Sequence, residues 1–303
     1  MGHSLKSQLK NAVYKSFKEG RNKHFEKENN HAWSKEGTSW SYETKFDRLD
    51  NAERLGKYIQ ERYPNIKMAK DIRIEHIQAY LTDCKDRGLT QATLESYASN
   101  CRALCRELER VYPSCPKYAV NMLKTPIAIR DKIRDHQMSE NARKCLIQSK
   151  NENVSNAGIL SAAFGLRAKE MTQIRSEDIY EKEGDVYAHV HGKGNRYREV
   201  KAINRDRGDR VLEIARNRGE KQTLIPIRDK SLERAVTREL KANNEYERYI
   251  GLHAARKTWA QELYNQYRQE HSKFETVGYV NEQLGHSAER DQELLDRYVY
   301  DAW

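Results

Sequence analysis

The chain is 303 residues long and strongly charged, with a formal net charge of +10 and a pI near 9.2. Charged residues make up 33% of it and hydrophobic residues 37%, so a core is feasible only beneath a densely charged surface. This length exceeds that of most single-core domains, and we expect two domains. Residues 1–130 carry about +8 of the net charge, which favours a polyanionic partner over a merely soluble basic surface.

The five cysteines show no pattern that predicts a metal site or a disulfide framework. They form no CxxC pair and have no histidine at a zinc-ligand spacing, so we expect reduced thiols. No stretch approaches the roughly 18 apolar residues that span a bilayer, and the N-terminus lacks an apolar signal core. A cytoplasmic location is the expectation.

The N-terminal part of the chain shows helical periodicity. Residues 4–19 place apolar side chains at spacings of three and four with lysines between them, which predicts a basic amphipathic helix. Residues 41–63, 74–84 and 92–111 are also predicted helices, the last with Thr90 as its N-cap. We expect a compact helical bundle over 41–111, followed by a proline-containing linker over 112–135.

The C-terminal part combines helices with one β-hairpin. Residues 186–191 and 197–203 alternate apolar and polar side chains, and the Gly- and Asn-containing turn between them predicts a hairpin. A break at Gly165 separates two predicted helices, and a loop is expected near Gly278. The predicted helices are 139–149, 154–164, 168–175, two within 204–250, 254–267, 280–284 and 291–300. The predicted fold class is therefore mainly α with a small antiparallel β-sheet (α+β).

Several polar residues are candidates for binding an anion. Arg167 follows the Gly165 break and can project from the start of a helix toward an anion, while Glu170 lies one turn later and can orient its guanidinium. His253 and Arg256 are three residues apart, so on a helix they share a face and can grip one anion together.

Three further candidates lie on turns or near the C-terminus. Lys193 is at the tip of the predicted hairpin, where it can reach a phosphate. This position disfavours a nucleotide-binding P-loop, because the lysine of a P-loop lies between a strand and a helix. His286 follows a Leu-Gly helix end, and Tyr298 and Tyr300 come after it. With no carboxylate cluster in the sequence, this set suggests that a phosphodiester is handled without a metal.

The ordered set of Arg167, Lys193, His253-x-x-Arg256, Leu-Gly-His286 and a late tyrosine resembles the tyrosine recombinases, the phage integrase family. These motifs cover residues 158–300. The resemblance implies a helical core-binding domain over 41–111 and a tyrosine recombinase catalytic domain over 136–303. Residues 1–40 are then either a basic DNA-contacting arm or a helix packed on the first domain.

The resemblance also implies how the residues divide the work. Arg167 and Arg256 would clamp the non-bridging oxygens of the scissile phosphate, a task that suits the planar guanidinium fork. His253 and His286 would add hydrogen bonds, with His253 able to accept the tyrosine proton. Lys193 would protonate the departing 5′ oxygen, and Glu170 would brace the site.

The chemistry of a tyrosine nucleophile agrees with these roles. A phenol of pKa about 10 is a poor nucleophile unless cationic neighbours favour its phenolate. Attack produces a 3′-phosphotyrosyl link that preserves the phosphodiester energy, so rejoining needs no ATP, and neither a metal nor another cofactor is expected. The resemblance implies double-stranded DNA recombination sites as partners, a homotetramer on two sites, and accessory DNA-bending or directionality factors of a mobile genetic element.

Two alternatives stay open at this point. Twelve positions separate His286 from Tyr298, more than in many members of the family, so Tyr300 is an alternative nucleophile. On a helix over 291–300, Tyr298 shares the inward face with Leu294 and Leu295, which favours Tyr298. The fold could also serve a DNA-binding or architectural protein that does not cut, or a type IB topoisomerase.

Overall fold

The structure is a computed structural model that describes residues 4–19, 41–128, 136–192, 197–247, 250–286 and 298–299. The chain divides into two units, Met1–Lys132 and Ile133–Trp303, each with its own hydrophobic core. Residues 20–40, part of the predicted linker, Lys193, Tyr300 and most of the predicted terminal helix lie outside the described residues. Among the described residues, no helix is both long and apolar enough to cross a membrane.

The first unit is a helical bundle. Its helices are α1 (Leu5–Ser16), α3 (Tyr42–Arg62), α4 (Ile74–Asp86) and α5 (Gln91–Val111), with short 3₁₀ turns η1 (Ala69–Asp71) and η2 (Val120–Met122). Each predicted helix of this unit is confirmed to within two residues at each end, except that α1 ends at Ser16, three residues before the predicted end. Thr90 is the predicted N-cap of α5, since its hydroxyl accepts a hydrogen bond from the Thr93 backbone N–H.

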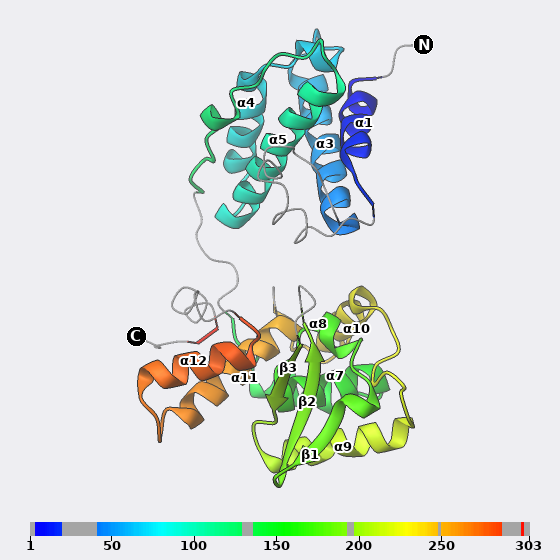
Figure 1. The fold of residues 1–303 in the computed structure, drawn as a ribbon, viewed down its shortest axis with the longest axis vertical. Helices are drawn as coiled ribbons and strands as arrows, with labels where there is room; N and C mark the ends of the chain where they lie inside the picture. Colours follow the sequence, from blue (N-terminus) through cyan, green and yellow to red (C-terminus); the bar gives the residue numbers. More distant parts are fainter. Residues whose placement is uncertain are drawn as a thin grey trace. The chain divides into compact units, whose positions relative to one another are not determined.

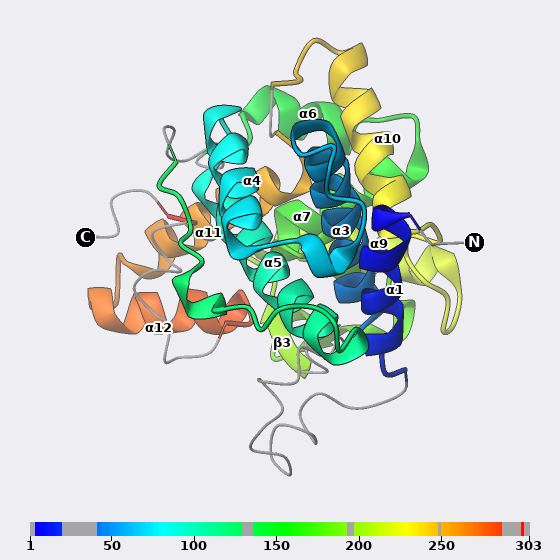
Figure 2. The same cartoon turned by 90° about the horizontal axis from the view of Figure 1, so that it is seen from above.

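Helix α1 is an integral part of this bundle. Figures 1 and 2 show it beside α3, and its apolar face, including Leu5 and Leu9, is fully buried. The two helices approach closely at Gly56, where an added Cβ would lie 2.9 Å from Lys6 Cγ. Residues 5–16 are therefore packed on the first unit, as one of the two readings of the sequence expected.

The second unit combines helices with a three-stranded antiparallel sheet of order β1-β2-β3 (Figure 1). The strands are β1 (Ile179–Lys182), β2 (Asp185–His191) and β3 (Tyr197–Lys201), and on β2 the residues Val186, Ala188 and Val190 face the core. The helices are α6 (Glu140–Ile147), α7 (Glu152–Phe164), α8 (Ala168–Met171), α9 (Arg205–Arg218), α10 (Asp229–Ala242), α11 (Leu252–Tyr267) and α12 (Lys273–Gln283), and η3 (Ser176–Asp178) precedes β1.

Three sequence expectations for this unit are wrong in detail. Strand β1 was not predicted. The helix expected over 168–175 ends at Met171, because Ile174 and Ser176 instead exchange backbone hydrogen bonds with the segment at Gln222 and Leu224. Gly278 lies within α12 rather than in a loop, since that helix begins at Lys273 under a Ser272 capping box.

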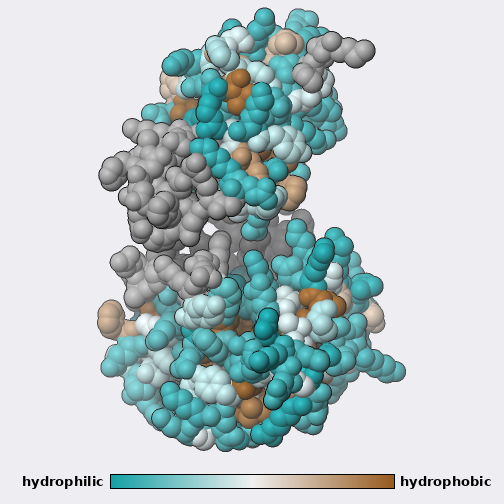
Figure 3. All heavy atoms as spheres, turned by 45° about the vertical axis from the view of Figure 1, so that its right-hand side comes forward, coloured by the Kyte–Doolittle hydropathy of each residue, from teal (hydrophilic) through white to brown (hydrophobic). Residues whose placement is uncertain are grey.

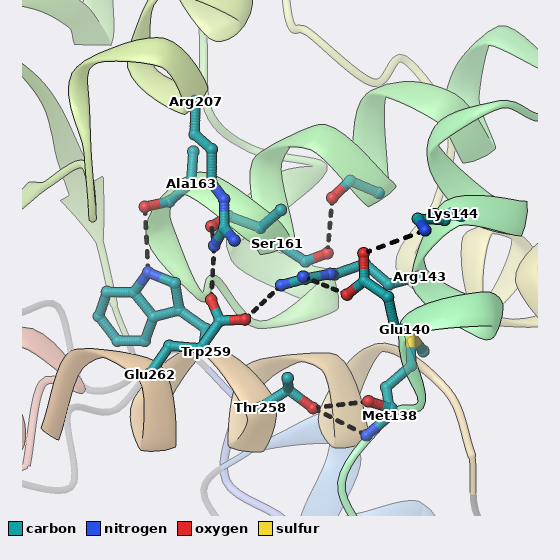
Figure 4. Close-up of polar contacts among 12 residues, drawn as sticks. Met138, Glu140, Arg143, Lys144, Ser161, Ala163, Arg207, Thr258, Trp259 and Glu262 are labelled. Carbon is teal, nitrogen blue, oxygen red and sulfur yellow. Dashed lines mark hydrogen bonds and ion pairs between the residues drawn. The ribbon is translucent and has the colours of Figure 1, made fainter. Parts of the chain in front are cut away.

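Helix α11 is fixed to its neighbours by polar contacts, which Figure 4 shows. Glu262 pairs with Arg143 of α6 and with Arg207 of α9, each at 2.5 Å. The Trp259 indole N–H donates to the Ala163 carbonyl of α7 at 3.0 Å. Because α11 carries both His253 and Arg256, these contacts set the position of two candidate site residues.

The visible surface in Figure 3 is mostly hydrophilic, with apolar residues scattered over it. This agrees with the high share of charged residues in the sequence. Individual exposed apolar side chains such as Phe46 and Phe274 occur in both units, as is normal for soluble domains.

Candidate functional site

The turn after α7 places Arg167 and Glu170. Gly165 ends α7 in a left-handed conformation with φ of 58°, which glycine adopts without steric cost. Arg167 then precedes α8, where its backbone N–H and its Nη1 donate to the two carboxylate oxygens of Glu170, both at 2.9 Å. Glu170 orients the Arg167 guanidinium, as the spacing of the two residues predicted.

Arg256 lies at the centre of the site and is fully buried. Its Nη1 donates to the Gly165 carbonyl at 2.6 Å and its Nη2 to the Leu284 carbonyl at 2.5 Å, while Nη1 lies 3.7 Å from a Glu170 oxygen. Burial, helped by the charge of Arg167, lowers the pKa of Arg256 to about 10, so the side chain stays cationic at neutral pH.

His286 lies beside Arg167. Its Nε2 is 3.2 Å from Arg167 Nη2, and because a guanidinium only donates, Nε2 accepts this bond and the proton is on Nδ1. Burial, then the charges of Arg256, Arg167 and Arg198, lower the pKa of His286 to about 4. The ring is therefore neutral at pH 7, and within the described part of the chain its buried Nδ1 has no hydrogen-bond partner.

Tyr298 packs among these groups with 9% of its surface exposed. Its ring centroid lies 5.6 Å from that of His253 and 5.3 Å from that of His286. The Arg256 Cζ is 5.8 Å from the same ring. The inward position expected for Tyr298 is observed, whereas no geometry is described for Tyr300 or for Lys193.

The structure adds Arg198, which the sequence analysis missed. Its side chain, 10% exposed, binds Glu170 with both guanidinium nitrogens at 3.0 and 2.9 Å. Burial disfavours the charged form of Glu170, but the Arg198 hydrogen bonds and the Arg256 charge outweigh it and lower the pKa of Glu170 to about 2. The available signal was an arginine on the second predicted strand of the hairpin, on the same face as the buried Val200.

The cluster as a whole carries an excess of positive charge. Three arginines converge on one carboxylate, which leaves a local positive charge at the place where Tyr298 and two histidines meet. Fixed cationic donors of this kind stabilise the charge that develops on a phosphoryl group. Within the described ranges, no group of three or more His, Cys, Asp or Glu side chains has the arrangement of a metal site.

The chain thus consists of a helical unit followed by a unit in which helices and a small antiparallel sheet surround this cluster. Residues 30–111 match the family model described as phage integrase, N-terminal. No curated protein matched the chain.

Three solved structures illustrate the similarity of fold. The XerH site-specific recombinase bound to palindromic difH substrate aligns with a TM-score of 0.61 and 17% identity over 96% of this chain and 92% of that chain. A lambda integrase tetramer bound to a Holliday junction aligns with a TM-score of 0.62 and 16% identity over 90% of this chain and 77% of the integrase chain. The Tn1549 transposon integrase in complex with transposon right end DNA aligns with a TM-score of 0.57 and 12% identity. That alignment covers 96% of this chain and 95% of the integrase chain. The chain therefore has the tyrosine recombinase fold, which is the fold that the sequence resemblance implied.

Proposed function

We propose that this protein is a site-specific recombinase that cleaves and rejoins duplex DNA through a 3′-phosphotyrosyl intermediate. The observation that carries the proposal is the setting of Tyr298, whose ring lies close to His253, His286 and the Arg256 guanidinium. Neighbours of these types favour the phenolate or take up its proton, which turns a weak nucleophile into an effective one.

The reaction exchanges one phosphorus–oxygen bond for another. The Tyr298 oxygen attacks the scissile phosphorus, a bond between them forms, and the bond from phosphorus to the 5′ oxygen breaks. The phenol proton passes to His253, and Lys193 supplies the proton that the 5′ oxygen takes up. Reversal by a 5′ hydroxyl from another strand releases the tyrosine, so neither ATP nor a redox partner is consumed.

The arginines act on the phosphate rather than on the proton. Arg167 and Arg256 hold the non-bridging oxygens, and Glu170 keeps the Arg167 fork in one orientation through a 2.9 Å ion pair. His286, neutral and protonated on Nδ1, offers one further donor. These groups are already oriented before substrate binds, which is where most electrostatic stabilisation of a transition state originates.

The partner in this proposal is double-stranded DNA. Residues 1–130 hold about +8 of the net charge of +10, which supports substantial phosphate contact by the first unit. The lambda integrase relative was solved as a tetramer on a Holliday junction, and we propose four copies acting on two sites here as well. Accessory DNA-bending or directionality factors belong to the same proposal.

A covalent-adduct assay tests the proposed function. Nicked suicide duplexes covering the DNA that flanks the gene should trap the protein on a labelled strand, in a form that resists detergent and disappears with protease. Because the candidate site is made of arginines, histidines and a tyrosine, the adduct should form at an unchanged rate in excess EDTA. An adduct that is lost in EDTA and restored by magnesium would overturn the mechanism.

The same assay separates the two alternative functions. A protein that binds these duplexes tightly but forms no adduct on any of them is a DNA-binding protein on this fold. A protein that relaxes supercoils through an adduct yet exchanges no strands between two sites is a topoisomerase. Neither alternative accounts better for a tyrosine that lies within the cationic cluster.

The leaving-group role of Lys193 is predicted to be separable from binding. Lys193→Ala should slow cleavage of an ordinary phosphodiester by about 100-fold, within the range of general acid catalysis. A 5′-bridging phosphorothiolate, whose thiolate leaves without a proton, should restore most of the rate, as measured by single-turnover adduct formation. If the sulfur substrate brings no recovery, Lys193 has a binding role instead.

A further inference from the structure

Arg198 lies in the candidate site but has no role in the proposed reaction. It lies on β3, two residues after the end of the undescribed segment 193–196, and its side chain points inward with 10% exposure. A nearly buried arginine retains its charge, so its ion pairs and hydrogen bonds must offset the free-energy cost of removing it from water. The partners of Arg198 lie on two different sides of the candidate site.

The first partner is the carboxylate that orients Arg167. Arg198 binds Glu170 through two parallel bonds, Nη1 to Oε1 at 3.0 Å and Nη2 to Oε2 at 2.9 Å. A two-pronged bond of this type fixes both the position and the plane of the carboxylate. Since the same carboxylate accepts two bonds from Arg167, the direction of the Arg167 fork depends on Arg198.

The second partner is the end of α12, just before His286. Arg198 Nε donates to the Gln283 carbonyl at 3.0 Å, and the Lys201 backbone N–H donates to the Gln283 side chain at 3.0 Å. Gly285 has a φ of 67°, and a Cβ there would lie 3.0 Å from Arg198 Nη1. The glycine turn that leads to His286 therefore packs closely against the Arg198 side chain.

We infer that Arg198 is a positioning residue. From strand β3 it fixes the Glu170 carboxylate, and through it Arg167, and it also fixes the turn that leads to His286. The inference rests on the proposed function for its effect on cleavage. The Arg198 side chain touches no reacting atom in this assignment.

The contacts of Arg198 affect the pKa of His286. The charged groups that face its ring are Arg256 from α11, Arg167 at the start of α8, Arg198 from β3 and the opposing Glu170 of α8. The Tyr298 ring also packs against the His286 ring, with 5.3 Å between the ring centroids. Removal of the Arg198 charge takes away one of the cations that disfavour the imidazolium, and it also frees the turn that keeps the ring buried. Both effects raise the pKa of His286 toward its ordinary value.

The test compares Arg198→Gln and Arg198→Lys in the full-length protein. Histidine ring resonances, with His286 assigned by a His286→Gln spectrum, should titrate near pH 4 in the wild type and at clearly higher pH in Arg198→Gln. Arg198→Lys retains the charge but not the fork, so its His286 should titrate between the two. Cleavage of the suicide duplex should slow by about 100-fold in Arg198→Gln, the scale of a displaced catalytic group, with little change in DNA affinity.

Arg205 provides the matched control, because it is also an arginine in ion pairs, here with Glu181 and Asp209, but lies at the start of α9. Arg205→Gln should leave the His286 titration and the cleavage rate unchanged. An unaltered His286 pKa in Arg198→Gln, or equal effects of the Arg205 and Arg198 variants, would overturn the inference. The titration needs no DNA, so it decides the role of Arg198 even if the wild type forms no adduct and the proposed function fails.

Discussion

Tyr298→Phe is expected to abolish the covalent adduct with nicked DNA while leaving DNA affinity unchanged. The substitution removes only the phenolic oxygen, and the ring that packs near His253, His286 and Arg256 is retained. No other group in the described cluster can form a phosphotyrosyl bond. The measurements are adduct formation on a suicide duplex and, in parallel, binding of the same duplex by fluorescence anisotropy.

Tyr300→Phe is the matched control, since it makes the same chemical change two residues later. It should still form the adduct at a rate close to that of the wild type. The opposite pattern, with Tyr298→Phe active and Tyr300→Phe inactive, would assign the nucleophile to Tyr300. In that case the long spacing after His286 changes the nucleophile, and the position of Tyr298 reflects core packing.

Most helices were predictable because their apolar residues repeat at helical spacing and their ends carry local signals. Thr90 is an example, a predicted N-cap whose hydroxyl does accept the expected hydrogen bond. Strand β1 has only one buried residue, Ile179, and its turn at Glu183 and Gly184 requires positive φ at both positions. Glutamate is an unusual residue in such a turn, so neither alternation nor turn composition revealed the hairpin.

In the candidate site, too, contacts between residues close in sequence were predictable, whereas contacts made only by tertiary packing were not. Arg167 with Glu170, and His253 with Arg256, were found because each pair is close in sequence on or beside one helix. Arg198 escaped notice because its partners, Glu170 of α8 and Gln283 of α12, are distant from it in sequence and meet it only through tertiary packing. The complete burial of Arg256 has the same origin, since its two carbonyl partners belong to Gly165 and Leu284.

Gly165→Ala should cause the largest loss of stability among single-methyl additions in the second unit. Gly165 has φ of 58°, and a Cβ there would lie 2.2 Å from Trp259 Cε3, in a ring held by its hydrogen bond to Ala163. Positive φ at a non-glycine residue and overpacking against a buried ring each cost about 1–3 kcal/mol. We therefore expect the free energy of unfolding to fall by about 3–5 kcal/mol, measured by urea denaturation.

Gly184→Ala separates the two causes, because Gly184 has φ of 81° but an added Cβ would meet no atom within 4 Å. This control should lose about 1 kcal/mol, the cost of the left-handed backbone alone.

Gly165→Ala should also slow adduct formation under conditions where it remains folded, because the Gly165 carbonyl accepts the 2.6 Å bond from Arg256. Equal losses in the two variants would mean that Trp259 moves aside at no cost, and that the close contact between α7 and α11 does not set the position of Arg256.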